Sequence, residues 1–381
     1  MRKLYLFFLV IFYSPIIVFV TMYFNLFFPK KNVRLLPVNF SRIGGIYPLF
    51  WYLKLKNLKK ISKNNLDIFF VGDDYKHNSF WLKIWKRSFN FSKFSSFWKI
   101  YYLLKKKFNY KFDKSIEEYS CLQNQYLSKA NQNIFNNMSK DEENKIVNSK
   151  AVNLIFSNKE KEIGNSYLNK YKTSDYKFVC FHSRDSSYLK SYMPDKDWSY
   201  HNHRDCNINN YELAIKNLSK KGITCFRTGS ITKDKLKFSS SKIIDYANNN
   251  DRSDFLDIYL GAKCYMSVYS ECGITVIPEL FERPIVYTNW PGLSISSFNP
   301  NSLIIFKKFY SEKKKRFLSF KEINNLENCG NSSAHNLEEK GIKLIENTPD
   351  EINDAVFENL NRLQGNWKET KEEKKLQKKF W

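Results

Sequence analysis

Apolar and polar stretches alternate through the second half of the chain in the order expected of a parallel α/β sheet. Phe178–Phe181 is an unbroken apolar run, which is typical of a strand buried on both faces. Strands and helices that alternate along the chain indicate a doubly wound sheet with right-handed crossovers. Further strands are predicted at Ile223–Arg227, Lys242–Tyr246, Tyr265–Tyr269 and Pro284–Thr288, with helices at Tyr211–Lys220, Phe255–Ala262 and Thr275–Phe281.

Residues that favour helix ends support these boundaries. Asn209 or Asn210 is suited to cap the first of the three helices, and Gly222 is suited to end it. Ser253 or Asp254 is the natural cap of the second helix. The alternation of strands and helices is therefore supported by local signals as well as by hydrophobic pattern.

The first half of the chain begins with a strand, a glycine turn and a helix. Val33–Phe40 reads as the strand, Arg42-Ile43-Gly44-Gly45 as the turn, and an aromatic helix continues through Leu58. Glycines allow a close backbone approach at a helix N-terminus, so Arg42, Gly44 and Gly45 are candidate acceptor-side residues. A tight strand-to-helix turn without a binding role explains the same residues equally well.

A second strand of this half is predicted at Leu66–Val71, and it ends in Gly72-Asp73-Asp74. Paired carboxylates after a strand can hold a metal ion. Asn and His follow where further ligands would be needed, so a loop and helix cap are favoured here. No metal site is predicted in the chain.

Two domains of similar plan are expected. The polar stretch Asp113–Asn165 has few signals, and a linker is predicted near Tyr167–Tyr176, where polar residues interrupt the hydrophobic periodicity. The expected domains are residues 33–166 and 177–346. Residues 347–381 form a helix and charged tail, since Thr348-Pro349-Asp350-Glu351 combines a cap, a first-turn proline and a carboxylate that reaches back.

A membrane segment is expected at the start of the chain, in residues 1–32. Leu4–Phe28 is almost continuously apolar and carries no charge. Its length is close to the ~20 residues that a helix needs to span a bilayer. Basic residues flank both ends, so the orientation stays open. A signal peptide is disfavoured because the run is long, aromatic and without a small-residue cleavage site.

Phe80–Phe108 alternates aromatic and basic residues on predicted amphipathic helices. Such a surface suits an anionic lipid or an anionic acceptor. In the alternative, the aromatic rings form a core and the lysines face solvent.

The 381-residue chain carries a net charge of +24, which favours anionic partners. A coding bias toward Lys, Asn and Ile explains much of this excess, and no nucleic-acid-binding module is recognisable, so nucleic acid is not a predicted partner. Seven scattered cysteines without a CxxC pair indicate reduced thiols and a cytosolic compartment.

A polar cluster follows the central strand. His182, Arg184 and Asp185 stand at its carboxyl end, where open α/β sheets bind ligands. The guanidinium of Arg184 has the planar fork that matches a diphosphate. In the alternative, Arg184 pairs with a carboxylate to tie down a loop, and His182 is satisfied locally.

The order of these blocks resembles a family of bacterial glycosyltransferases, often encoded near surface-polysaccharide genes, that have the two-Rossmann-domain plan called GT-B. The resemblance rests on SRIGG, HSRDSSYL, RDCNINNYELAIKNLSKKGITCFRTGS, RSDFLDIYLGAKC and PELFERPIVYTNW. It implies an α/β fold with two Rossmann-like domains whose parallel sheets face a cleft, preceded here by the membrane helix.

The resemblance also implies that the C-terminal domain binds a nucleotide sugar as substrate, with no cofactor. Arg184 is the first candidate for the diphosphate, and the turn after the strand at Tyr265–Tyr269 offers backbone amides and a hydroxyl. The full set of candidate donor-binding residues is Arg184, Arg227, Gly229, Arg252, Ser253, Asp254, Ser270, Gly273, Ile274, Thr275 and Glu279.

Glycosyl transfer also needs a base for the acceptor hydroxyl. Asp185 is the first candidate and His182 the alternative. The sequence thus predicts an enzyme at the bacterial inner membrane with a cytoplasmic catalytic part, which acts on a lipid-linked or surface glycan acceptor. HxR is also similar to fucosyltransferase-like enzymes, and a non-catalytic membrane-anchored scaffold that binds polyanions is the second function class. Stereochemistry and oligomeric state stay open.

Overall fold

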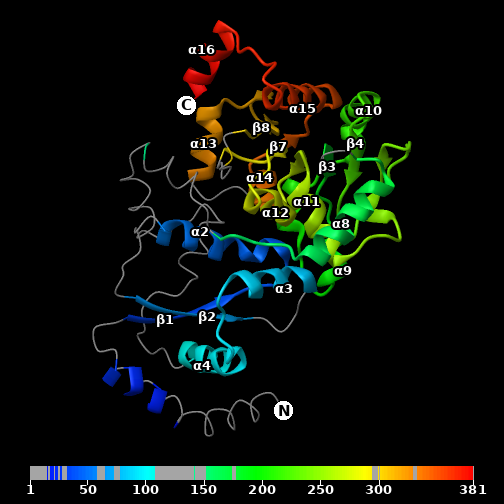
Figure 1. The fold of residues 1–381 in the computed structure, drawn as a ribbon. Helices are drawn as coiled ribbons and strands as arrows, with labels where there is room; N and C mark the ends of the chain where they lie inside the picture. The colour runs from blue at the N-terminus through cyan, green and yellow to red at the C-terminus, as the bar shows by residue number, and fades with distance from the viewer. Residues whose placement is uncertain are drawn as a thin grey trace. The chain divides into compact units, whose positions relative to one another are not determined.

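The computed structural model divides the chain into two compact units, Met1–Ser157 (unit 1) and Asn158–Trp381 (unit 2). It describes residues 15, 18–20, 22–24, 26–27, 32–57, 65–72, 78–107, 141, 152–173, 177–293, 299, 301–328 and 333–380. Each unit is described by itself, and Figure 1 shows the elements of both.

Unit 1 contains a parallel pair of strands with helices on both faces. Strand β1 (Asn32–Val38) pairs with β2 (Asn65–Val71), as the hydrophobic pattern predicted. Figure 1 shows α4 on one face of the pair and α2 and α3 on the other. The helical elements are η1 (Ile43–Ile46), α2 (Tyr47–Asn57), α3 (Ser79–Ser88) and α4 (Ser95–Lys107).

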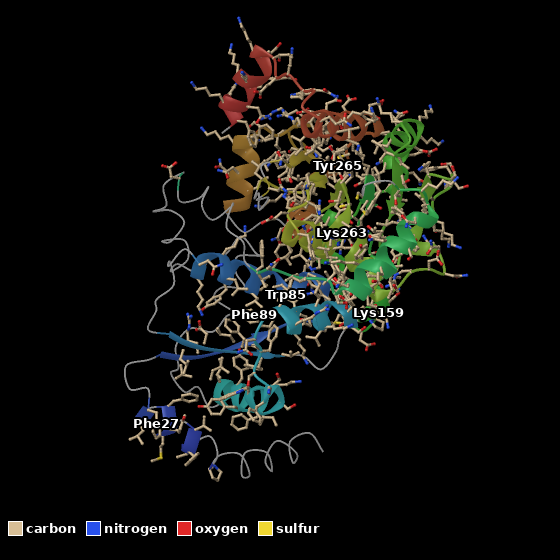
Figure 2. The ribbon with its side chains drawn as sticks, viewed as in Figure 1. Phe27, Trp85, Phe89, Lys159, Lys263 and Tyr265 are labelled. Carbon is tan, nitrogen blue, oxygen red and sulfur yellow. The ribbon has the colours of Figure 1, made fainter. Side chains whose placement is uncertain are left out.

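Aromatic side chains fill the spaces between these layers. Phe89, which follows α3, packs edge-on against Phe69 of β2 and against Trp85 of α3 (Figure 2). On the other face, Tyr101 of α4 packs with Leu35 and Phe70. Most of the described aromatic residues of Phe80–Phe108 therefore supply core, as one of the two interpretations of that stretch expected, while Phe94 and several of the lysines are exposed.

Unit 2 contains a six-stranded parallel sheet, so the predicted doubly wound sheet is confirmed. The strand order is β5-β4-β3-β6-β7-β8, and every neighbouring pair is parallel. The chain starts at β3, moves outward to β5, and returns to the other side of β3 at β6. The strands are β3 (Phe178–His182), β4 (Thr224–Arg227), β5 (Ile243–Ile244), β6 (Met266–Ser270), β7 (Ile285–Trp290) and β8 (Leu303–Phe306).

Alternate residues of the central strands point to opposite faces of this sheet. Val179 and Phe181 pack under α10 (Glu212–Lys220) and α15 (Pro349–Leu363). Phe178 instead contacts Phe226, which meets the rings of α8 (Asn158–Lys170). An unbroken apolar strand is thus required because both faces are covered.

The remaining elements of unit 2 include several that the sequence pattern did not predict. Strand β8 and the three-stranded antiparallel sheet that follows it are among them. The elements are α9 (Ser187–Tyr192), η3 (Ser199–Arg204), η4 (Ile208–Tyr211), η5 (Tyr246–Asn248), α11 (Asp254–Lys263), η6 (Gly273–Thr275), α12 (Val276–Leu280), β9 (Lys308–Ser311), β10 (Arg316–Phe317), α13 (Phe320–Asn328), α14 (Ala334–Glu339), β11 (Ile342–Ile345) and α16 (Lys371–Phe380).

Most predicted helix ends are confirmed, and one is wrong. Ser253 caps α11 by accepting from the Leu256 amide, Thr348 forms a full capping box with Glu351, and Gly222 has φ +80°. Neither Asn209 nor Asn210 caps α10. The chain enters that helix through η4, whose first amides are capped by Asn207.

The boundary between the units lies after Ser157, ahead of the linker that we expected at Tyr167–Tyr176. Helix α8 continues to Lys170, and the Tyr167 ring contacts Phe226 and Tyr246 of unit 2. The polar residues around Tyr167 face solvent while its ring joins the core, which is why the stretch resembled a linker.

Two predictions fall on residues outside this description. Asp73 and Asp74 lie outside the described residues, as does most of Leu4–Phe28. Among the residues that are described, no helix is long and apolar enough to cross a bilayer. The described ranges also contain no cluster of His, Cys, Asp or Glu suited to a metal ion.

Gly164 is a point where packing overrides helix propensity. A Cβ at this position of α8 would lie 2.2 Å from the Tyr259 ring of α11. We expect Gly164→Ala to lower the free energy of unfolding by about 1–3 kcal/mol, although alanine favours helix by about 1 kcal/mol. Urea denaturation measures the change. Gly164→Ala with Tyr259→Leu should recover part of the loss, and equal stability of wild type and Gly164→Ala would contradict the close contact.

Candidate functional site

The carboxyl ends of β3 and β6 form the point where the chain changes direction across the sheet. In doubly wound sheets, this switch point is where ligands bind. His182 is the last residue of β3, Arg184 follows the strand, and Ser270 ends β6. The Arg184 amide donates to the Ser270 hydroxyl over 2.8 Å, which joins the two strand ends.

Arg184 is buried and already has a carboxylate partner. Its Nη1 forms an ion pair with Asp205 and donates to the His201 carbonyl over 3.2 Å. Burial and the nearby charge of Arg204 lower the Arg184 pKa to about 10. Arg184 therefore ties down the loop of residues 201–205, as one of the two interpretations expected. A ligand that bound Arg184 would share its guanidinium with Asp205.

Two further cations, Arg204 and Lys307, lie at the loop of residues 201–205. The sequence analysis gave neither of them a role. Arg204 forms an ion pair with Glu271 at 3.2 Å, and buried Lys307, which follows β8, donates to the His203 and Asp205 carbonyls. Only folding brings them together, since more than 100 residues separate them, so no local pattern could have paired them.

His203 lies among these charged groups. Burial is the main cause that lowers its pKa to about 4, and the charges of Arg204, Arg184 and Lys307 lower it further. The group combines three cations with the carboxylates of Asp205 and Glu271. The arrangement favours an anionic ligand at the carboxyl edge of the sheet.

His182 is held in a tautomer that can accept a proton. Its Nδ1 lies 2.9 Å from the Thr228 carbonyl oxygen. A carbonyl can only accept, so Nδ1 carries the hydrogen and Nε2 carries the lone pair. Burial lowers the His182 pKa to about 4, and Arg227 and Arg184 contribute to this shift.

Asp185 is held between two loops. Its Oδ1 accepts from the Ser187 amide over 2.8 Å, and its Oδ2 accepts from the Lys233 amide over 3.0 Å. Both carboxylate oxygens of Asp185 thus accept hydrogen bonds from backbone amides. Of the two candidate bases, His182 keeps the lone pair of its Nε2, whereas both oxygens of Asp185 accept hydrogen bonds from backbone amides.

Arg227 and Gly229 support the site from within. Arg227 is 1% exposed and donates to Thr232 at 2.9 Å and to Asp245 at 3.2 Å, which places it in the interior beneath the edge. Gly229 has φ +146°, and a Cβ there would lie 3.4 Å from His182 Nδ1. A glycine is therefore needed for the backbone conformation beside His182.

Arg252, Ser253 and Asp254 form the start of α11. Arg252 donates to the Gly229 carbonyl over 3.3 Å and to Asp257 over 3.0 Å. The Ser253 hydroxyl accepts from the Leu256 amide as a cap, and Asp254 begins the helix. These contacts are the ones that a purely structural helix start would make.

The turn after β6 has its hydroxyl groups engaged within the protein. Ser270 accepts from Arg184, and Thr275 donates to the Cys272 carbonyl over 2.7 Å. Gly273 and Ile274 leave backbone amides as the remaining donors of the turn. Glu279 lies on α12 and accepts from the Tyr287 hydroxyl over 2.5 Å.

The predicted acceptor-side residues lie in unit 1, at the turn after β1. The Gly45 amide donates to the Arg42 carbonyl over 3.0 Å. A Cβ on Gly45 would lie 2.7 Å from the Asn39 carbonyl oxygen, and Gly44 is buried in the same turn. The tight-turn interpretation of this motif accounts for both glycines.

The lowered pKa of His203 predicts sensitivity to acid. His203 has a folded pKa of about 4, against an ordinary value of ~6.5. Its stabilising contribution is therefore present above about pH 6.5 and lost as the pH falls toward the folded pKa. Burial raises the pKa of Asp257 to about 6. Asp257 therefore changes the free energy of unfolding in the opposite direction to His203 over the same pH range.

We expect His203→Asn, which keeps a donor for the Tyr200 carbonyl, to lose less stability than wild type between about pH 7 and about pH 4. The difference should approach about 3 kcal/mol. Urea midpoints across this pH range measure it. Parallel curves for wild type and His203→Asn would show that His203 is not held neutral.

Comparison with solved structures gives only distant likenesses, of which three are described here. No family model and no curated protein matches the chain. A glycosyltransferase family 9 structure from Veillonella parvula matches at TM-score 0.45 and 7% identity, over 87% of this chain and 98% of that one. The E. coli ADP-heptose LPS heptosyltransferase II matches at TM-score 0.40 and 12% identity, and the match covers 88% of this chain and 100% of that one. UDP-GlcNAc 2-epimerase from Neisseria meningitidis matches at TM-score 0.31 and 11% identity, and the match covers 88% of this chain and 100% of that one. At these scores the likenesses assign no function.

Proposed function

We propose that the protein is a membrane-associated glycosyltransferase that moves a sugar from a nucleotide-sugar donor to a lipid-linked or surface glycan acceptor. The observation that carries the proposal is the grouping of three cations, Arg184, Arg204 and the buried Lys307, around residues 201–205 at the carboxyl edge of the sheet. An inner-membrane location with a cytoplasmic catalytic part belongs to the same proposal.

The diphosphate of the donor fits this edge for a chemical reason. Transfer breaks the bond between the sugar C1 and the diphosphate oxygen, and the electron pair leaves with the diphosphate. Guanidinium groups stabilise the growing negative charge without a metal ion. Arg204, whose side chain is 20% exposed, is the more accessible of the two arginines, and Arg184 is held behind it by Asp205.

His182 is the proposed base. As the acceptor oxygen bonds to C1, its proton moves to the free Nε2 of His182. The negative charge of a bound diphosphate offsets the charges of Arg184 and Arg227, which lower the His182 pKa in the free protein. The His182 pKa therefore rises when the donor binds, toward the range in which a base is effective.

Arg184 can be tested with a matched control that breaks the same ion pair. Calorimetry on the full chain with a panel of nucleoside diphosphates and nucleotide sugars is expected to show saturable binding of one nucleotide. Arg184→Ala should weaken it by about tenfold to a hundredfold, the value of a charged hydrogen bond. Asp205→Asn leaves the guanidinium in place and should bind at least as well as wild type.

Equal losses in Arg184→Ala and Asp205→Asn would show that Arg184 acts only by holding the loop. Absence of any nucleotide binding to the folded protein would overturn the proposed enzyme. The second candidate, a non-catalytic scaffold, would then be favoured. It predicts steep salt dependence of polyanion binding and no response to Arg184→Ala, since dispersed lysines release counterions collectively. Donor profiling separates GDP-fucose from other sugars.

A further inference from the structure

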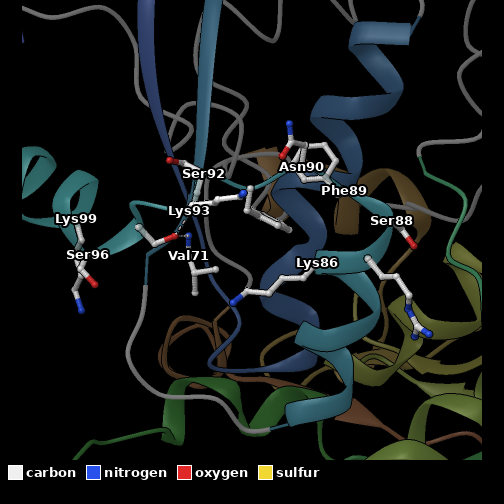
Figure 3. A pocket seen from close by; sticks show the side chains of 12 residues that line it. Val71, Lys86, Ser88, Phe89, Asn90, Ser92, Lys93, Ser96 and Lys99 are labelled. Carbon is white, nitrogen blue, oxygen red and sulfur yellow. Dashed lines mark hydrogen bonds between the residues drawn. The ribbon is translucent and has the colours of Figure 1, made fainter.

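Unit 1 contains a pocket of about 800 Å³ that the proposed reaction does not use. It lies between α3 and α4, beside the last residue of β2 (Figure 3). The Ser95 hydroxyl accepts from the Val71 amide over 3.3 Å, which holds the start of α4 against the strand. The pocket is lined by Val71, Lys86, Arg87, Ser88, Phe89, Asn90, Phe91, Ser92, Lys93, Ser95, Ser96 and Lys99.

The lining of this pocket has a single sign of charge. Four of its residues are Lys or Arg and none is Asp or Glu. Figure 3 shows Lys86 on α3, Lys93 on the connection between the helices, and Lys99 on α4. Lys86 and Lys93 are exposed, and neither forms an ion pair with the described part of the chain. Serine and asparagine side chains add neutral donors, so the pocket suits a phosphate group.

Exposed apolar side chains stand next to these cations. Phe94, which directly follows Lys93, is 71% exposed. The described part of the N-terminal segment also exposes Phe19, Leu26 and Phe27. That segment reaches α4, because the Phe24 ring lies 6.3 Å from the Trp98 ring. Large apolar groups beside lysines match the boundary between acyl chains and phosphate headgroups in a bilayer.

We propose that this pocket binds the phosphate of an anionic phospholipid headgroup while Phe94 enters the acyl boundary beside it. Lys86 and Lys93 provide the charge, and the exposed side chains of Phe19, Leu26 and Phe27 extend the contact. The site is independent of nucleotide binding in unit 2. It would seat unit 1 on a lipid surface whether or not unit 2 transfers a sugar.

Vesicle cosedimentation of the full chain tests the proposal. Binding to vesicles of phosphatidylcholine with an equal amount of phosphatidylglycerol is expected to exceed binding to phosphatidylcholine alone. Lys86→Gln and Lys93→Gln should each weaken binding to the anionic vesicles by about fivefold. Phe94→Ser should weaken it by about tenfold. The matched control, Lys235→Gln with Lys237→Gln, removes two exposed charges from unit 2 and should bind as wild type does.

Two results would overturn the proposal. Equal losses in the pocket and control variants would mean that the overall positive charge, and not the pocket, holds the lipid. Displacement by glycerol phosphate in solution, at the same phosphate concentration as the vesicles, would mean that the pocket takes a soluble phosphate. We expect little displacement, because Phe94 contributes only at a bilayer.

Discussion

Replacing His182 with asparagine is expected to lower turnover by about a hundredfold to ten-thousandfold, the usual contribution of a positioned general base. Asparagine can still donate to the Thr228 carbonyl, as His182 Nδ1 does at 2.9 Å, but it has no group that accepts a proton at the position of Nε2. The donor should bind to this variant as it does to wild type.

The measurement is turnover of the donor sugar against pH, with nucleotide binding measured by calorimetry alongside. Wild-type turnover should fall on acidification as Nε2 takes up a proton, and the residual activity of His182→Asn should lack this step. Asp185→Asn is the matched comparison. If Asp185→Asn abolished turnover and His182→Asn did not, the base would be Asp185, and its hydrogen bonds to Ser187 and Lys233 would open during the reaction.

Removing Asp67 from unit 1 is expected to lower the stability of the strand pair by about 3–5 kcal/mol. Asp67 lies opposite Arg34 in the parallel register of β1 and β2. Arg34 Nε donates to Asp67 over 2.8 Å, and Arg34 Nη2 donates to the Tyr52 hydroxyl over 2.7 Å. The two charged side chains are only 5% and 3% exposed, so Asp67→Ala would remove a buried carboxylate that accepts from a buried cation.

Hydrogen exchange of the β1 and β2 amides measures this loss separately from the stability of unit 2. Arg34→Met with Asp67→Leu removes both charges together and should retain most of the protection, because an apolar pair of similar volume avoids the desolvation cost. Unchanged exchange in Asp67→Ala would show that water reaches Arg34 and that the pair contributes little.

Hydrophobic pattern was sufficient to predict five of the six strands of the main sheet, all except β8. Phe178–Phe181 has to be apolar throughout because helices cover both of its faces, and this requirement is visible in the letters alone. Caps such as Ser253 and Thr348 were also predictable, since the capping side chain and the amide it binds lie within three residues of each other. The prediction that Asn209 or Asn210 caps α10 was wrong, because a turn of 3₁₀ helix precedes α10 and the capping residue is Asn207 at the start of that turn.

The candidate site was predictable only in part. The position of His182 and Arg184 at the end of a buried strand was sufficient to place them at the carboxyl edge of the sheet. Their partners were not predictable: Asp205 reaches Arg184 from 21 residues away, and Lys307 approaches the same loop from more than 100 residues away. The basic pocket of unit 1 is similar, since the sequence shows lysines among aromatic residues but not which of them line one cavity.

By itself, then, the sequence determined the strands, helices and caps, because each depends on a few neighbouring residues and on which faces are buried. The tertiary structure alone decided which charged groups are paired, which tautomer His182 adopts, and that Arg227 lies in the interior beneath the edge. These properties depend on side chains that the fold brings together from distant parts of the chain, and on the desolvation that follows when water is excluded from them.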